Sequence, residues 1–236
     1  MSILQKLPAI LALAASVIIL LSSILCLVFK MTAFTSYMDG THWGTSVTIL
    51  QSPGYKPHGW IRLYPLHLMP VIRAPLVVAG SFGLVIGLAM TWLIASSFRR
   101  KHARQLSFVQ QTTLVTILCA NALLATISMI YVLVQHGRSA HFDAEYLPPT
   151  AWYDNGQFSL EAWACETPRY VKELGKYSLG EQCVGERGSR ILVVVLCFFS
   201  LAVPGLLVWD LNTAQVVVAK KAPKRKDSWE DEGWEY

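Results

Sequence analysis

Charged residues are scarce in this chain: Asp, Glu, Lys and Arg make up 15% of its 236 residues. Soluble domains typically contain about 25%. The scarcity is concentrated in four runs without any charged residue, at positions 7–29, 74–98, 112–135 and 191–209. Because about 20 apolar residues in a helix cross the hydrocarbon core of a bilayer, each run is long enough to span a membrane. The composition therefore excludes a soluble globular protein and predicts four transmembrane helices.

The first run lacks the marks of a cleaved signal peptide. Its 23 residues, 7–29, exceed the length of about 7–15 that is typical of the apolar core of such peptides. The stretch that ends it, "SSILCLVFK", contains no clear small-x-small cleavage site. We therefore expect this run to be retained as a membrane anchor.

Motifs for redox, metal and covalent chemistry are absent as well. No Cys-x-x-Cys or Cys-His cluster occurs, which argues against a thiol oxidoreductase and against a zinc site. His42, His58 and His67 lie 16 and 9 positions apart with no Cys, Asp or Glu beside them, a spacing that matches no familiar metal site. No Asn-x-Ser/Thr acceptor for N-glycosylation is present. We expect no cofactor, no metal and no enzymatic activity.

The basic residues that flank the runs predict the orientation in the membrane. Between the second and third runs stand Arg99, Arg100, Lys101 and Arg104. After the fourth run come Lys220, Lys221, Lys224, Arg225 and Lys226. Short segments rich in Lys and Arg remain in the cytoplasm. Both of these segments are therefore expected on the cytoplasmic side.

With four spans, this orientation divides the rest of the chain between two sides. Residues 1–6, 99–111 and 210–236 are predicted to be cytoplasmic. The two longer loops, 30–73 and 136–190, then face the exterior of the cell or the lumen of a secretory compartment. The sequence thus predicts an integral protein of the plasma membrane or the secretory pathway with both termini in the cytoplasm.

Only two of the five cysteines lie outside the apolar runs. Cys165 and Cys183 both fall in the second long loop, which is predicted to face an oxidising compartment. Two cysteines in that setting most simply form a disulfide. Closing a loop of this size stabilises a fold by about 3 kcal/mol in the chain-entropy model. We expect a small disulfide-bonded domain here.

The second run contains small residues at intervals of four: Ala79, Gly83, Gly87 and Thr91. Glycine destabilises a helix in water, but in lipid it lets a neighbouring helix approach closely. This pattern predicts a packing seam, whose partner is another span of the same chain or a second copy. A hinge or a lipid-docking groove is the alternative interpretation.

The third run carries an amide near its middle, Asn121. A polar side chain at that depth requires a partner, so it should point into the bundle. It either forms an interhelical hydrogen bond or lines a path for a substrate or ion. Thr112, Thr116, Ala120 and Ser128 are expected to share one face of the same helix. The absence of charged residues from all four runs weighs against active transport.

The two outer loops contain local structure signals. "TSVTIL" is typical of a short strand, and the aromatic residues of 59–73 favour a segment lying along the membrane surface. In the second loop, "YDNGQF" has the Asn-Gly signal of a hairpin. "TPRYVKELG" predicts a helix capped by Thr167 and ended by Gly175.

The tail changes charge sign along its length. Its five basic residues lie next to a membrane whose inner leaflet is negative, so they are predicted to contact lipid. The acidic and aromatic end, "DSWEDEGWEY", is predicted to be disordered and to dock a cytosolic partner.

The layout resembles that of tetraspan membrane proteins in general, with both termini inside and a larger disulfide-bearing second outer loop. The Cys-Cys-Gly motif of tetraspanins is absent, and the cysteine pair lies in the second outer loop rather than the first, where claudin-like proteins carry theirs. The four-span quinone-linked epoxide reductases need a Cys-x-x-Cys that is missing. The resemblance concerns topology alone and implies no functional residue.

The sequence thus predicts an all-α, four-helix membrane bundle with a small disulfide-bonded extracytoplasmic domain. We expect a non-enzymatic organiser, or accessory subunit, of a membrane complex. It would contact lipid, other membrane proteins or a second copy through the second span, and a cytosolic protein through its tail, with no nucleic-acid partner. A channel or transporter with a polar path near Asn121 is the alternative.

Overall fold

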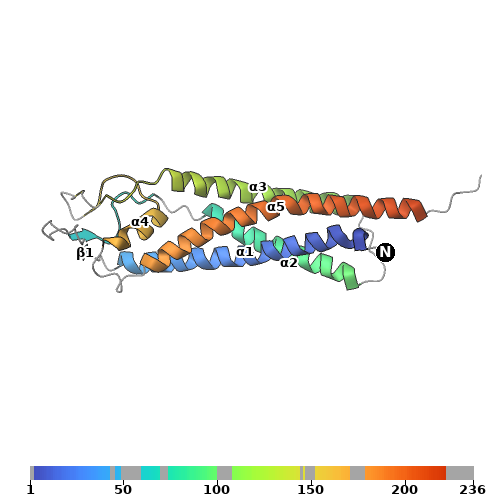
Figure 1. The fold of residues 1–236 in the computed structure, drawn as a ribbon, viewed down its shortest axis with the longest axis horizontal. Helices are drawn as coiled ribbons and strands as arrows, with labels where there is room; N and C mark the ends of the chain where they lie inside the picture. Colours follow the sequence, from blue (N-terminus) through green and yellow to red (C-terminus); the bar gives the residue numbers. More distant parts are fainter. Residues whose placement is uncertain are drawn as a thin grey trace, which may run out of the picture.

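The computed structural model confirms a bundle of four long helices that are apolar enough to cross a membrane. It describes residues 3–42, 46–48, 60–69, 74–99, 108–143, 146, 152–170 and 179–221. The long helices are α1 (Ile3–His42), α2 (Ala74–Arg99), α3 (Phe108–Gly137) and α5 (Leu179–Lys221). α1 begins and α5 ends at one end of the elongated bundle, opposite the end that carries α4 and β1 (Figure 1).

Two helices are much longer than a bilayer is thick. α1 has 40 residues and α5 has 43, which at 1.5 Å per residue is about 60 Å each, twice the hydrocarbon core. Residues 30–42 and 179–190, which composition placed in loops, are therefore continuous with the spans. α5 also continues through Pro204 without a break. The two helices project past the apolar runs and support the structure beyond them.

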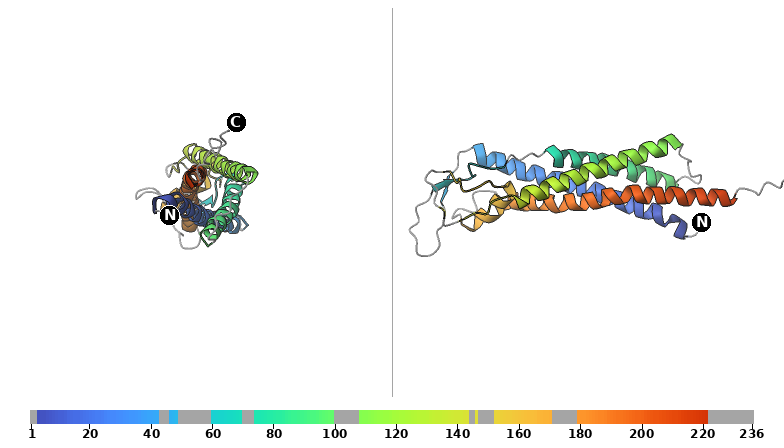
Figure 2. Two further views of the ribbon diagram at one scale, coloured as in Figure 1. Left: turned by 90° about the vertical axis from the view of Figure 1, so that its right-hand side faces the viewer. Right: turned by 90° about the horizontal axis from the view of Figure 1, so that it is seen from above.

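The helices pack in a ring in which α1 and α3 each lie against both α2 and α5 (Figure 2). Aliphatic and small side chains fill the space between them, including Ile19, Met90, Leu118 and Leu196, each no more than 2% exposed. Many large apolar side chains on the outer faces are exposed, as expected for helices that meet lipid. The bundle therefore has a closely packed interior and an apolar exterior.

The partner of the small-residue seam on α2 is α1 of the same chain. A Cβ added at Gly87 would lie 2.9 Å from the backbone nitrogen of Leu20, and one at Gly83 would lie 2.6 Å from Ser23 Oγ. Ala79 is buried along the same line, and Thr91 is half-buried at its far end. The absence of a side chain at Gly87 lets the two backbones touch, and Gly83 leaves room for the Ser23 side chain, so α1 covers this part of the seam.

A second close approach, which the sequence did not indicate, joins α1 to α5. A Cβ at Gly185 would lie 2.8 Å from the carbonyl oxygen of Phe29, and one at Gly188 would lie 2.9 Å from the Phe29 ring. Both glycines belong to the part of α5 that extends past the apolar run. Close packing therefore holds α1 and α5 together beyond the spans as well as within them.

A compact domain covers the end of the bundle opposite the termini. It contains the antiparallel pair β1 (Ser46–Thr48) and β2 (Trp60–Arg62), helix α4 (Leu160–Glu166) and a single 3-10 turn, η1 (Thr167–Arg169). We call this whole domain the aromatic cap, because aromatic rings form its buried core: Tyr64, Phe142, Tyr153, Phe158 and Trp163. The Trp163 indole donates a hydrogen bond to the Leu63 carbonyl at 2.7 Å, which satisfies its one polar group.

Of three local predictions for the cap, two differ from the structure and one is confirmed. In the segment predicted to follow the membrane surface, Leu63 and Tyr64 are instead buried in the core of the cap, where packing removes their apolar area from water. "YDNGQF" turns at Gly156 (φ +102°), but its Phe158 pairs with Leu68 and not with Tyr153, so the hairpin prediction is wrong. The predicted strand is present as β1.

The helix of the second loop lies before the predicted one. α4 begins after Ser159, whose side chain accepts a hydrogen bond from the Ala162 amide at 3.1 Å. Thr167, the predicted cap, instead begins η1. Residues 171–178, which include the predicted helix end at Gly175, lie outside the described residues.

Burial of Tyr64 predicts a loss of stability at alkaline pH. Burial raises the pKa of its hydroxyl from 10 to about 12, although the hydrogen bond from Gln182 (2.7 Å) opposes this. The folded state thus holds the proton more tightly, so this stabilisation is complete below pH 10 and is lost as pH rises toward 12. We expect a contribution on the order of 2 kcal/mol to disappear across this interval.

Tyr64→Phe tests this expectation through the free energy of unfolding, measured by circular dichroism from pH 8 upward. The variant lacks the Gln182 hydrogen bond and should be about 1 kcal/mol less stable at neutral pH. Its difference from the wild type should shrink as pH rises and then change sign, because only the wild type loses the stabilisation linked to the Tyr64 proton. A difference that stays constant through pH 12 would contradict the assignment.

Candidate functional site

The disulfide predicted from the sequence is present and joins two helices. Cys165 lies near the end of α4, and Cys183 lies in the first turns of α5. The bond therefore fastens the aromatic cap to a helix that continues into the bundle. The three other cysteines are free, and Cys26 and Cys197 among them are buried between the spans.

A buried ion pair connects α1 to α5 directly beneath the cap. The Lys30 ammonium donates to both carboxylate oxygens of Glu186, at 2.7 and 2.5 Å. The two side chains are only 12% and 10% exposed. Removing two charges from water is costly, and the short bidentate contact offsets that cost. The pair is fixed by the close packing of α1 and α5 around Gly185 and Gly188.

Glu161 of α4 is the second acidic group at this level. Its carboxylate accepts from Arg190 of α5 at 2.9 Å and lies 3.6 Å from His136 Nδ1 of α3. Burial raises the pKa of Glu161, and the nearby Glu186 raises it further, against the lowering effect of Arg190, His136 and Arg187. The docked position of α4 thus places a carboxyl group where a proton is held more tightly than in water.

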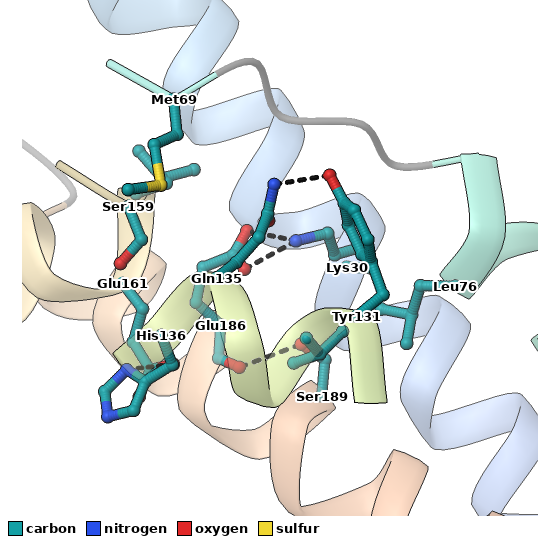
Figure 3. A pocket seen from close by; sticks show the side chains of 12 residues that line it. Lys30, Met69, Leu76, Tyr131, Gln135, His136, Ser159, Glu161, Glu186 and Ser189 are labelled. Carbon is teal, nitrogen blue, oxygen red and sulfur yellow. Dashed lines mark hydrogen bonds and ion pairs between the residues drawn. The ribbon is translucent and has the colours of Figure 1, made fainter. Parts of the chain in front are cut away.

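These side chains form one group, which we call the polar cluster: Lys30, His136, Glu161, Glu186 and Arg190. Four helices contribute to it, and Figure 3 shows Lys30 directed at Glu186 and His136 directed at Glu161. Two cations face two carboxylates, so the cluster is electrically balanced when His136 is neutral. It occupies the boundary between the apolar runs and the cap.

A small cavity of about 50 Å³ opens beside the polar cluster. Its wall includes Lys30, His136, Glu161 and Glu186, together with apolar residues such as Leu76 (Figure 3). Gln135 donates a hydrogen bond to the Tyr131 hydroxyl on the same wall. A cavity of this size holds water, which needs only about 10–15 Å³ of such space. Water can therefore reach the titratable groups.

The charged groups of the polar cluster are engaged with one another. Within the described ranges, no group of three or more His, Cys, Asp or Glu side chains is placed to hold a metal ion. Each charged group of the polar cluster contacts a group of opposite charge, whereas a nucleophile or general base needs a free face toward a substrate. The geometry is that of a structural junction between cap and bundle.

Asn121, the polar residue predicted at mid-membrane, lies outside the polar cluster. Asn121 is buried, and its amide donates to Ser200 Oγ of α5 at 3.0 Å. Ser128 is also buried and donates to the Pro75 carbonyl of α2 at 2.9 Å. Thr112, Thr116 and Ala120, which were expected on the face of Ser128, are exposed on the outside of the bundle. Asn121 thus bonds between helices and does not line the cavity.

The remaining predicted residues are not brought together with the polar cluster. Gly83, Gly87 and Thr91 lie deeper along α2. Lys220 and Lys221 end α5 at the opposite end of the molecule, and Lys224, Arg225 and Lys226 lie outside the described residues. His58 also lies outside them, and His67 is exposed in the cap.

The borders of the apolar runs contain one sequence signal for the polar cluster. Lys30 directly follows the first apolar run, His136 directly follows the third, and Arg190 directly precedes the fourth. These positions fall at one level in an antiparallel bundle. Charged residues that border several runs at the same level are candidates for mutual pairing.

Comparison of the chain with protein-family models, with curated proteins and with solved structures finds no match. Conclusions about function therefore depend on the geometry alone.

Proposed function

We propose that the protein is a non-enzymatic tetraspan organiser that presents its aromatic cap, at a fixed position above the membrane, to other membrane proteins. An organiser needs a surface whose position relative to the bilayer does not vary. Its polar groups serve to hold that surface in place instead of performing chemistry.

The observation that carries this proposal is the number of independent connections between cap and bundle. α5 continues from the span into the cap and makes two connections to α4, the disulfide at Cys183 and the ion pair of Arg190 with Glu161. A covalent bond and an ion pair within three turns of one helix leave the cap little freedom to move. A lid or gate would need the opposite property.

The disulfide and the basic segments support one orientation. Disulfides persist on the exterior of cells and in secretory compartments. The cap would then face that side, with both termini in the cytoplasm, in the plasma membrane or a secretory-pathway membrane. The tail would contact anionic lipid through its basic residues and a cytosolic protein through its acidic end.

A channel or transporter would use the same helices differently. Asn121 donates to Ser200, and the charges of the polar cluster are paired with one another. A permeation path requires polar groups that are available to the permeating species. These contacts favour the organiser. A permeation path is tested by the flux measurement below.

The test combines partner capture with flux. We expect cross-linking in native membranes, followed by purification, to recover a discrete set of membrane proteins. The Cys165→Ser/Cys183→Ser variant should lose that set while its spans still assemble. In liposomes, the purified protein should carry no flux of ions or small solutes above that of empty vesicles.

Asn121→Leu distinguishes the two functions. Ala120→Leu, on the exposed side of the same helical turn, is the matched control. Flux that Asn121→Leu abolishes and Ala120→Leu preserves would replace the organiser with the channel. Partner capture that survives loss of the disulfide unchanged would also contradict the proposal.

A further inference from the structure

Two histidine–glutamate pairs connect α4 to the end of α3. His136, in the last turn of α3, lies 3.6 Å from Glu161 in the first turn of α4. His141, which follows α3, lies 2.8 Å from Glu166 in the last turn of α4, and Glu166 also accepts from the Phe142 amide at 2.7 Å. Both ends of α4 are thus held by a carboxylate that faces an imidazole.

The inner pair is only partly exposed to solvent. The His136 side chain is 42% exposed and Glu161 is 11% exposed, whereas the His141 side chain is 88% exposed. The cavity borders both members of the inner pair, so water can exchange protons with them. Electrostatic effects should therefore be larger at His136 than at His141.

The other charges around Glu161 act on the same equilibrium. Arg190 and Arg187 of α5 favour its ionised form, whereas Glu186 of α5 disfavours it. Lys30 of α1 forms its ion pair with Glu186 and not with Glu161. With His136 neutral, the charges of Lys30, Glu161, Glu186 and Arg190 cancel. A proton added here is thus taken up beside two carboxylates.

We propose that the contacts of His136 with Glu161 and of His141 with Glu166 form an acid-strengthened latch that seats α4 on the bundle. When α4 is docked, a proton on His136 creates an ion pair, and a proton on Glu161 relieves the cost of a buried carboxylate. When α4 opens, neither gain exists. The proton thus gains a partner, or relieves a cost, that exists only when α4 is docked, so acidification favours docking.

Histidine is the side chain whose charge most readily changes in the range in which secretory compartments acidify, so the latch is expected to respond there. α4 would be seated most firmly in an acidic lumen and less firmly at neutral pH, while the disulfide keeps it attached to α5. The inference does not depend on the organiser function, because it concerns the local opening of α4 alone.

Hydrogen exchange of the full-length protein in detergent tests the latch. We expect the protection of residues 160–169, corrected for the intrinsic rate at each pH, to rise when pH falls from 7.5 to 5.5. Partly exposed ion pairs correspond to at most about fivefold in an equilibrium, so a rise of about threefold to tenfold is expected for the two pairs together. Residues 118–128 of α3, within the span, are the internal control.

Two substitutions at the partly exposed His136 give opposite outcomes. His136→Gln should remove most of the pH response, and His136→Arg should give high protection at both pH values. His141→Gln should reduce the response only slightly. Protection that is unchanged or lower at pH 5.5 in the wild type would overturn the latch, as would a full response in His136→Gln or no increase in His136→Arg at pH 7.5.

Discussion

Gly87→Leu is expected to prevent stable assembly of the bundle, with a loss of at least about 3 kcal/mol in the free energy of unfolding. The Cβ position of residue 87 lies 2.9 Å from the backbone nitrogen and 3.0 Å from the Cα of Leu20. Backbone cannot rotate away as a flexible side chain can, so α1 and α2 must separate. Separation would break the close packing on which helix association in lipid depends.

Gly205→Leu is the matched control. It makes the same substitution in a membrane helix at a site where an added Cβ meets no atom within 4 Å. It should leave stability unchanged or slightly raised, because glycine is a poor helix former. Unfolding in a titration with sodium dodecyl sulfate, followed by circular dichroism, measures both variants. Equal stability of the two would show that α1 does not approach α2 as described.

Lys30→Met is expected to destabilise the protein by about 3–5 kcal/mol, the usual cost of removing one partner from a buried ion pair. Methionine replaces the apolar stem of lysine, so little packing is lost. The carboxylate of Glu186, however, remains 10% exposed without its cation. The loss should appear in the same titration at pH 7.5.

The double variant Lys30→Met/Glu186→Leu separates charge from packing. Replacing both members of a buried pair with apolar residues is often neutral or stabilising. We therefore expect it to recover most of the stability that Lys30→Met loses. A double variant as unstable as the single one would mean that the lysine stem, and not the isolated carboxylate, caused the loss.

The number of helices and the disulfide were predictable because each depends on a local or compositional property. Four runs without charge can cross a bilayer only as helices. Cys165 and Cys183 stood out because they are the only cysteines outside those runs. The close approach at Gly83 and Gly87 was also visible as a pattern, although only the structure identifies α1 as the partner.

The polar cluster was not predictable from the same patterns. Lys30 and Arg190 have the appearance of ordinary residues at the ends of spans. Their roles depend on α1 and α5 continuing as helices past those ends. The charged and glycine-rich sequences of these extensions do not predict a helix. Glu161 acquires its neighbours only when α4 docks on α3 and α5. Such long-range pairing is decided by tertiary packing, as is the pairing of Phe158 with Leu68.

The continuity of α5 has a mechanical consequence. Pro204 has no amide hydrogen, so the carbonyl of Ser200 lacks its usual helical donor. α5 is therefore least resistant to bending at this turn. The side chain of that same Ser200 is held by Asn121 from α3. α3 thus supports α5 at the turn where α5 resists bending least. We therefore expect a tilt of α5 at Cys183 to be transmitted as far as Lys221 instead of being lost as a bend at Pro204.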